Sequence, residues 1–363
     1  MATVWIIVLL IAAFVLFMAY PGYPLLLALL PRPNVKPPLA NDTPVSVVLV
    51  AKNESNRIES RIANLQASEH PIQEIILVCD GCTDETANLA RARGAKVIEQ
   101  PVSKGKPAGV NAGVAAASSE IVVLCDARQR FEHSTIRNLA RWFSDSSTGA
   151  VSGALEIETA GTAQGRGVDA YWKLEKFIRR VESDLDSSVG CTGAVYAVRR
   201  TSFVPMPDDT ILDDVVVPME IAKRGDRVRF DPEALAYDPQ QLDGAKELNR
   251  KVRTLAGNFQ MMARYPEWML PWGHRLWWKL ICHKYLRLTG PVALALMIVA
   301  TFALQPLVAW VLWGTFFGLA MLGRWKPSLV KAVSLPSGFV FLQWCIVRGF
   351  FYWLNRAEGG AWK

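Results

Sequence analysis

Four short polar motifs follow four β-branched runs of the sequence, and their residue types could bind a phosphorylated ligand. The motifs are Lys52-Asn53-Glu54, Asp80-Gly-Cys-Thr-Asp84, Lys104-Gly-Lys106 and Asp126-Ala-Arg128. Their carboxylates and amides can hydrogen-bond a polar ligand, and their lysines can offset phosphate charge. Each motif alone also has a plainer interpretation, since Asp84 suits a helix cap and a Lys-Gly-Lys turn is usually a solvated loop. Four motifs in succession are harder to explain in that way.

The runs before these motifs predict the strands of a mainly parallel sheet. They are Val45–Val50, Ile75–Cys79, Lys96–Glu99 and Ile121–Cys125. Stretches of helical periodicity lie between them, and this alternation is the signature of βαβ units. Open parallel sheets bind ligands outside the carboxyl ends of their strands. We therefore expect one α/β domain over residues 45–265, with the motifs gathered at one edge.

Both ends of the chain are apolar. Val4–Leu30 and Leu288–Gly323 carry no charge, and each is longer than the ~20 residues that cross a bilayer. Residues 1–30 lack the basic start and small-residue cleavage site of a secretory signal, so they predict an uncleaved transmembrane anchor. The proline-rich residues 31–44 predict a linker.

The C-terminal part predicts further membrane helices over residues 289–355, either two or three. Gln305-Pro306 divides the first apolar stretch into two crossings, and Leu335–Leu354 is expected to make the last. Basic residues flank these segments, which places the polar domain in the cytosol of a multi-pass protein of the inner (plasma) membrane.

Residues 266–288 predict an amphipathic helix in the membrane interface. The basic residues Arg275, Lys279, His283 and Arg287 recur every four positions, and apolar side chains fill the other face. A helix that docks on the polar domain is the alternative.

The net charge of +7 does not indicate a nucleic-acid partner. Much of the basic excess lies beside apolar segments, where anionic membrane lipids are the natural partners. Six cysteines form no framework, and Cys79-x-x-Cys82 lacks the second ligand pair of a zinc site.

The order of the motifs resembles the family 2 inverting glycosyltransferases of GT-A fold, and the apolar ends resemble the branch that includes cellulose and hyaluronan synthases. The resemblance implies a Rossmann-like, mixed but mainly parallel sheet with N- and C-terminal transmembrane helices. It also implies a UDP-sugar donor, bound at its nucleotide by Asp80 and Asp84 and at its phosphates by Lys106. Asn53 and Glu54 would complete this donor site. Cys79 replaces the first of two acids found in many members, which weakens the expectation of uracil.

The family's Asp-x-Asp motif holds Mg²⁺ or Mn²⁺, and here Arg128 replaces its second aspartate. The resemblance therefore implies a divalent metal ion held by Asp126 alone. Either Arg128 turns away from this position, or it pairs with phosphate itself.

Two later motifs resemble the acceptor side of the family. Gly190, Cys191, Thr192 and Gly193 match the small-residue loop beneath the acceptor sugar, although they also suit an ordinary turn. Asp213-Asp214 matches the motif that supplies the general base, and Asp214 is the expected base. A helix cap would account for one of these aspartates but not for both.

A last motif matches in part. Arg250-Lys-Val-Arg253-Thr254 stands where the synthases carry Gln-x-x-Arg-Trp, so Arg253 and Arg250 are expected at the donor diphosphate, or else on a basic helix face against lipid. The expected function is transfer of a sugar to a growing polysaccharide or lipid-linked saccharide, with partner subunits for polymer export. A polyprenyl-phosphate sugar synthase and a non-catalytic nucleotide-sugar-binding scaffold are the alternatives.

Overall fold

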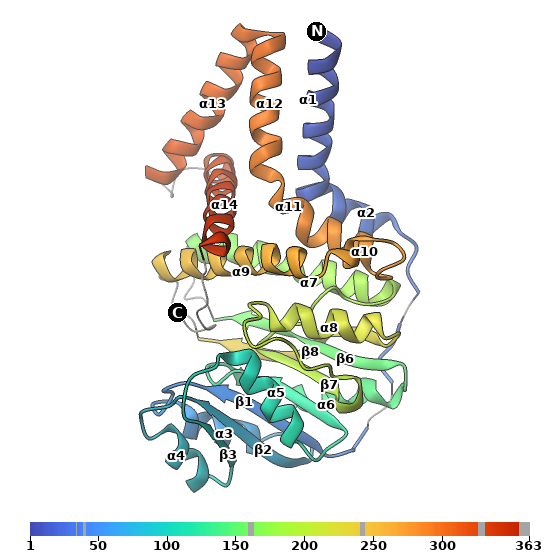
Figure 1. Ribbon diagram of the computed structural model, residues 1–363, viewed down its shortest axis with the longest axis vertical. Coiled ribbons are helices and arrows are strands. Elements are labelled where there is room, and N and C mark those ends of the chain that lie inside the picture. The colour runs from blue at the N-terminus through green and yellow to red at the C-terminus, as the bar shows by residue number, and fades with distance from the viewer. Residues whose placement is uncertain (34, 39–40, 159–162, 240–243, 326–330, 356–363) are drawn as a thin grey trace. The chain divides into compact units, whose positions relative to one another are not determined.

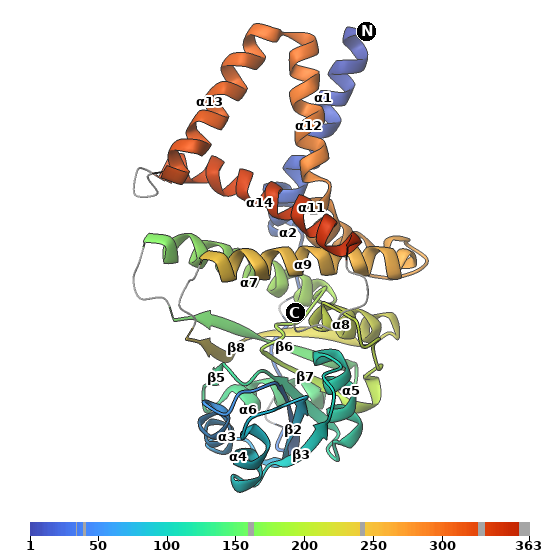
Figure 2. The same ribbon diagram turned by 60° about the vertical axis from the view of Figure 1, so that its left-hand side comes forward.

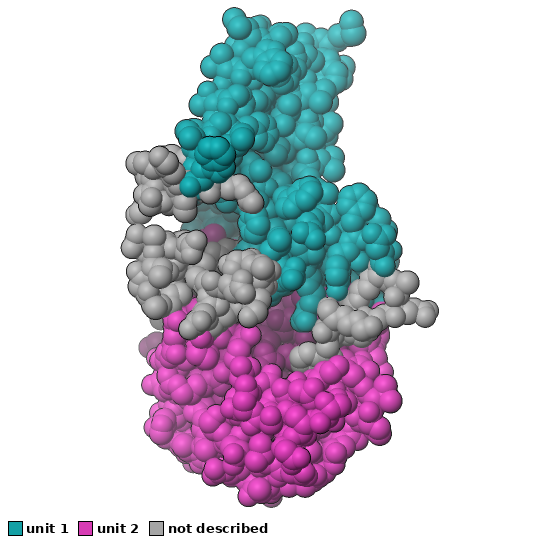
Figure 3. Space-filling view, turned by 90° about the vertical axis from the view of Figure 1, so that its left-hand side faces the viewer, with its two compact units in different colours: residues 1–29, 243–273, 277–356 teal, residues 30–242, 274–276, 357–363 magenta. Residues whose placement is uncertain are grey.

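The computed structural model describes residues 1–363 except 34, 39–40, 159–162, 240–243, 326–330 and 356–363, with backbone alone for 163–172, 244–247, 324 and 331–334. The chain forms two compact units, coloured separately in Figure 3. We call them the helical unit (residues 1–29, 243–273 and 277–356) and the sheet unit (residues 30–242, 274–276 and 357–363).

The sheet unit is built on an eight-stranded mixed sheet with the order β3-β2-β1-β4-β7-β6-β8-β5 (Figure 1). The first four strands pair in parallel, whereas β7 is antiparallel to β4 and β6. The strands are β1 Val45–Ala51, β2 Ile72–Asp80, β3 Lys96–Gln100, β4 Ile121–Cys125, β5 Arg130–Phe131, β6 Thr148–Ile157, β7 Val195–Arg199 and β8 Arg227–Asp238. All four expected strands are present, but β5, β6, β7 and β8 were not predicted from the sequence.

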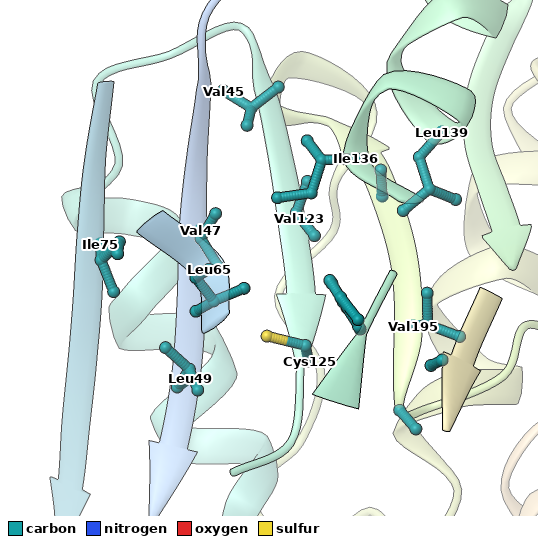
Figure 4. Packing of buried hydrophobic residues seen from close by; sticks show 14 of the residues in the cluster. Val45, Val47, Leu49, Leu65, Ile75, Val123, Cys125, Ile136, Leu139 and Val195 are labelled. Carbon is teal, nitrogen blue, oxygen red and sulfur yellow. The ribbon is translucent and has the colours of Figure 1, made fainter. Parts of the chain in front are cut away.

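Helices cover both faces of the parallel half. Because side chains alternate along a strand, Val47 and Leu49 of β1 face one side and Val48 and Val50 the other. On the first side they join a buried cluster with Leu65 of α3 and residues of α6 (Figure 4). The helices of this unit are α3 Ile58–Gln66, α4 Thr86–Ala92, α5 Lys106–Ala116, α6 Thr135–Ala140, α7 Ala163–Leu185 and α8 Asp213–Lys223, with 3₁₀ turns η2 Arg141–Ser144 and η3 Arg200–Ser202.

Helix α5 packs on the opposite face through two glycines. A Cβ added at Gly109 would lie 2.5 Å from Cγ1 of Val50, and one at Gly113 would collide with Val48. The backbone of α5 therefore lies directly on β1. This close approach fixes the start of α5, where Lys106 is the first residue.

The helical unit contains the apolar ends of the chain. Its elements are α1 Ala2–Phe17, η1 Met18–Gly22, α2 Tyr23–Leu29, α9 Gly244–Arg264, η4 Pro266–Met269, α10 Trp277–Leu280, η5 Ile281–Tyr285, α11 Leu286–Leu288, α12 Gly290–Leu304, α13 Pro306–Trp325 and α14 Lys331–Leu354. Helix α1 runs beside α12, and α14 lies along α9 (Figures 1 and 2). The break at Gln305 between α12 and α13 falls where the sequence predicts it.

Among the described residues, two helical segments are long and apolar enough to cross a membrane: residues 2–29 and residues 306–323. Residues 277–288 and 290–304 form a bent pair, at 61°, that could make a third crossing. Helix α14 does not meet these criteria, although Leu335–Leu354 was expected to be the last crossing. The side chains of the basic stretch 324–331 lie outside the described residues.

Residues 266–288 do not form the single amphipathic helix expected from the sequence. They divide into η4, a turn, α10, the π-helical η5 and α11. Lys279 and His283 are 2% and 1% exposed, so their side chains do not line a polar outer face. Arg275 binds the backbone carbonyls of Gly225 and Asp226 inside the sheet unit.

Candidate active site

The loops after β1 and β2 are tied together by Asn53. Its backbone has a φ of 56°, in the left-handed region that asparagine tolerates better than most residues. Its side-chain Oδ1 accepts a hydrogen bond from the Thr83 amide at 2.8 Å. Glu54 lies beside it and pairs with Arg57 at 3.0 Å. Both expected donor-site residues therefore lie at the carboxyl end of β1.

Asp80 is fully buried at the end of β2. Its carboxylate accepts hydrogen bonds from the Ser103 hydroxyl at 2.8 Å and from the amides of Lys104 and Gly105 at 2.6 and 3.0 Å. These bonds hold the loop that precedes α5. The expected contact between Asp80 and the nucleotide stays a prediction, whereas its structural task is to position this loop.

Asp84 binds its own loop and the one before it. The amide and hydroxyl of Thr86 and the amide of Ser55 all donate to its carboxylate. Although burial acts to raise it, these hydrogen bonds lower the pKa of Asp84 to about 2. Asp84 thus binds the first amide of α4 from the position before the N-cap, Glu85, and its contact with the nucleotide stays a prediction.

Lys106 is the centre of a charged cluster. Its Nζ lies 2.8 Å from Oδ1 of Asp126, at the end of β4, and 3.4 Å from Oδ2 of Asp213, at the start of α8. Burial acts to lower the pKa of Lys106, but the charges of Asp126 and Asp213 raise it above its ordinary value. The side chain of Asp126 is 37% exposed and that of Asp213 only 9%. The cluster therefore brings two predicted carboxylates, Asp126 and Asp213, to the ammonium group of a third predicted residue.

The loop Gly190–Gly193 lies against Asp214. The Cys191 amide donates a hydrogen bond to the Asp214 carbonyl at 2.8 Å. A Cβ at Gly193 would lie 3.1 Å from Oδ2 of Asp214. A side chain at Gly193 would therefore crowd this carboxylate. The loop therefore lies beside Asp214, whose role as the base stays a prediction.

Residues 46–204 match the family model for glycosyl transferase family 2. The chain carries a family 2 glycosyltransferase domain. The resemblance inferred from the motifs is therefore confirmed, and the motifs from Asn53 to Gly193 all lie inside the matched range.

Two curated relatives and one solved structure show how far the likeness extends. Poly-beta-1,6-N-acetyl-D-glucosamine synthases from Staphylococcus aureus and Staphylococcus epidermidis are 26% and 23% identical to this chain over 232 residues. These matches cover 61% of this chain and 56% of each relative. The mannosyltransferase PcManGT from Pyrobaculum calidifontis, solved with GDP-Man and Mn²⁺, is 21% identical, with a TM-score of 0.74 over 97% of this chain and 100% of that one. This likeness confirms the expected GT-A-like mixed sheet.

Arg128 of the family 2 domain turns toward β8. Its guanidinium donates to Oδ2 of Asp238 at 2.7 Å, and the amide of Gln129 donates to the same oxygen at 3.1 Å. Asp238 is 1% exposed, so this pair neutralises a buried carboxylate. Of the two alternatives left open by the sequence, the structure has Arg128 turned away to a protein partner.

The residues around Asp126 fit a metal ion only if substrate phosphates and water supply most of its ligands. Within the described ranges, no group of three or more His, Cys, Asp or Glu side chains could hold an ion. Mg²⁺, however, is often held by one or two carboxylates together with substrate phosphates and water. The partly exposed carboxylate of Asp126 is compatible with that arrangement.

Arg250 and Arg253 belong to α9 of the helical unit rather than to the sheet unit. Arg253 is exposed and Arg250 is half-buried. Their expected approach to the donor diphosphate stays a prediction.

Two buried residues of the site were missed by the sequence reasoning. Arg179 of α7 donates a hydrogen bond to Thr192 in the glycine loop. Its only sequence signal is the spacing from Glu175, since oppositely charged residues four apart in a predicted helix can pair. Tyr196 of β7 places its hydroxyl near Asp213, and in the described part of the chain that hydroxyl has no hydrogen-bond partner. Nothing in the apolar run around Tyr196 distinguishes it from a core residue.

Proposed function

We propose that this chain is a membrane-bound inverting glycosyltransferase. It moves a sugar from a UDP-sugar to a growing polysaccharide or lipid-linked saccharide at the cytosolic membrane face. The observation that carries this proposal is the meeting of Lys106, Asp126 and Asp213 with the Asp214 carboxylate beside the glycine loop. The family 2 domain and the names of the staphylococcal relatives support the polysaccharide product.

The base in this reaction is Asp214. Its carboxylate takes the proton of the acceptor hydroxyl while that oxygen attacks the anomeric carbon of the donor. The bond from the anomeric carbon to the diphosphate oxygen breaks on the opposite face, which inverts the configuration. No covalent bond to the protein forms, so a single carboxylate suffices.

Lys106 stabilises the leaving diphosphate. It stands at the first turn of α5, where unpaired backbone amides and the helix dipole also favour an anion. Its ammonium group is held in place by Asp126 and Asp213 and stays charged. Fixed positive charge at the position where negative charge develops is the commonest source of large rate acceleration.

Asp126 would hold a divalent metal ion with the donor phosphates. When bound, Mg²⁺ or Mn²⁺ supplies Lewis-acid stabilisation of phosphate charge. The Mn²⁺ in the structure of PcManGT supports this proposal, and its GDP-Man makes a guanine nucleotide the first competitor to test against UDP-sugars.

The helical unit would anchor the protein as a multi-pass protein of the inner membrane. Its apolar helices contact membrane lipids, and partner subunits could carry a polymer away. The candidate spans at residues 2–29 and 306–323 support membrane insertion. The cytosolic orientation is inferred from the basic flanks of the apolar segments, and it belongs to this proposal together with the partner subunits.

A transfer assay with Asp214→Asn tests the proposed function. Purified full-length protein is given a panel of UDP-sugars and GDP-mannose, with and without Mn²⁺, and both nucleotide release and sugar transfer are measured. We expect the variant to lose at least about 100-fold in kcat, the low end of the usual range for a general base. Asp42→Asn, at an exposed carboxylate before β1, serves as the matched control and should keep wild-type activity.

The outcomes separate the alternatives. Full activity of Asp214→Asn would refute the base assignment. Radiolabelled product that extracts into organic solvent with a polyprenyl phosphate acceptor would favour the lipid-phosphate sugar synthase. Absence of release from every nucleotide sugar, together with retained nucleotide binding, would favour the non-catalytic scaffold.

A further inference from the structure

Arg179 is a largely buried cation beneath the glycine loop. Its side chain, 12% exposed, projects from α7 and makes two polar contacts. Nε donates to Oε1 of Glu175 at 3.2 Å, and a terminal nitrogen donates to Oγ1 of Thr192 at 2.6 Å. A buried guanidinium is costly unless its charge and its N–H groups are satisfied. We therefore expect the charge of this buried guanidinium, or the orientation of its N–H groups, to contribute to the site.

Thr192 is the point at which Arg179 acts on the loop. The Thr192 hydroxyl donates to the Gly153 carbonyl at 2.8 Å while accepting from Arg179, and its amide donates to the Ser152 hydroxyl at 2.8 Å. These contacts fix the residue directly before Gly193. Since Gly193 lies against the Asp214 carboxylate, Arg179 and Asp214 are on two sides of the same short loop.

Arg179 also interacts with Asp214 through its charge. Burial acts to lower the pKa of Arg179, but Glu175 and, next in strength, Asp214 raise it. Lys106 from α5, Cys191 from the loop and Tyr196 from β7 also interact with the charge of Asp214. Burial raises the pKa of both the Cys191 thiol and the Tyr196 phenol, so neither carries charge near neutral pH. Arg179 and Lys106 both act on Asp214 through their charge, and Lys106 also pairs with Asp126 and Asp213.

We propose that Arg179 is a positioning residue of the transfer reaction, which fixes the Thr192-Gly193 turn beside Asp214 and places a buried positive charge near that carboxylate. During transfer the acceptor proton moves to Asp214, the acceptor oxygen bonds to the anomeric carbon, and the diphosphate leaves with the electrons of its bond. Arg179 gains and loses no proton. This inference rests on the proposed function, because it takes Asp214 as the base.

Three variants at two positions test the inference. Arg179→Gln removes the charge and shortens the side chain, Arg179→Lys keeps the charge but loses the planar fork, and Glu175→Gln removes the partner that offsets the charge. The rate of sugar transfer is measured against pH for each purified full-length protein. Arg130→Gln, which breaks an exposed ion pair with Glu158, is the matched control.

The expected shifts have opposite signs. A nearby positive charge lowers the pKa of a carboxylate, so removal of the charge raises that pKa. A base that works in its ionised form loses activity as the pH falls through its pKa, and this fall then begins at a higher pH than in the wild type. Arg179→Gln should move the acidic limb of the kcat profile upward by about one pH unit. Glu175→Gln should move it downward, and Arg179→Lys should keep the wild-type limb while raising KM for the acceptor. A uniform loss in Arg179→Gln with no displaced limb in any variant would overturn the inference.

A second measurement works without turnover. Arg179→Gln and Asp214→Asn are combined in a double-mutant cycle, and thermal unfolding midpoints are measured at pH 7. We expect coupled, non-additive changes, and additive changes would contradict the inference even if Arg179→Gln proved inactive. If Arg179→Gln does not fold, the downward shift of the limb in Glu175→Gln and the raised acceptor KM with an unmoved limb in Arg179→Lys decide. A wild-type protein that uses no nucleotide sugar, together with a coupled cycle, would refute the proposed function but still support the interaction between Arg179 and Asp214.

Discussion

Arg128, which stands at the end of β4 where the family's motif has its second aspartate, pairs with Asp238 of β8. The guanidinium does not remain beside Asp126, because Asp238 offers a buried carboxylate at 2.7 Å. An ion pair with one buried partner is costly to break, since the carboxylate left behind has lost its water. Arg128 and Asp238 are therefore better understood as a structural pair than as part of the phosphate site.

We expect Arg128→Met to destabilise the protein. The loss of a hydrogen bond to a charged group costs about 1.5–3 kcal/mol, and Asp238 would keep only the Gln129 amide. For a domain of this size that lowers the thermal midpoint by several degrees. Asp238→Asn combined with Arg128→Met should cost less than the sum of the two single changes.

Two comparisons make this prediction specific. Arg130→Met removes the neighbouring exposed pair with Glu158 and should change stability little. Donor KM and the Mn²⁺ response should stay as in the wild type for Arg128→Met. An unchanged thermal midpoint with a raised donor KM would show instead that Arg128 binds phosphate.

At the residue level, the sequence predicted which side chains gather but not what each one holds. Asp80 and Asp126 both follow buried strands, and nothing local distinguishes them. The structure does, because the loop after β3 returns its amides to Asp80 while Lys106 reaches Asp126. Both partners lie more than 15 residues away along the chain, so only the folded arrangement assigns these roles.

At the scale of elements, α5 connects the sheet to the chemistry. Its glycines allow the helix backbone to lie on β1, and Lys106, the first residue of the helix, lies about one turn before Gly109. A shift of α5 therefore moves the ammonium group directly. The helix acts as a rigid link between the core and the charged cluster.

Gly109→Ala tests this link. Alanine usually stabilises a helix by about 1 kcal/mol relative to glycine, but here the new methyl would lie 2.5 Å from Cγ1 of Val50. We expect a lower thermal midpoint, an overpacking cost of about 1–3 kcal/mol and a several-fold loss of transfer activity. Gly314→Ala in α13, where a Cβ meets nothing within 4 Å, is the matched control and should be neutral or stabilising. Equal thermal midpoints for the two variants would show that α5 can shift away from β1 without loss of stability.

The same glycines explain why the sequence did not predict α5. Two glycines and a proline in 11 residues lower helix propensity, and packing on Val48 and Val50 outweighs that preference. Strand β6 was missed for a related reason, because its run Thr148–Ile157 mixes glycine, serine and alanine with few β-branched residues. The strands β1 and β4 were predictable because their β-branched character is local.

For the whole molecule, the sequence predicted the division into apolar ends and a polar middle, but residues 243–265, expected in the α/β domain, belong to the helical unit. The sequence could not predict that residues 274–276 belong to the sheet unit. That assignment depends on His274, which binds the Met219 carbonyl at 2.9 Å, and on Arg275, which binds the Gly225 carbonyl. Such contacts depend on the folded surface of α8 and its following turn, which no periodicity in residues 266–288 encodes.

The membrane topology of the whole chain can be decided at its C-terminus. Three crossings, by residues 2–29, by the bent pair ending at Leu304 and by residues 306–323, would place the N-terminus outside and return the chain to the cytosol before α14. Alkaline phosphatase needs disulfides and is active only outside the cytosol. We expect a fusion after Lys363 to be inactive and a fusion after Gln305, between α12 and α13, to be active. An active fusion after Lys363 would show that α14 crosses after all, because one more crossing reverses the side of every residue that follows it.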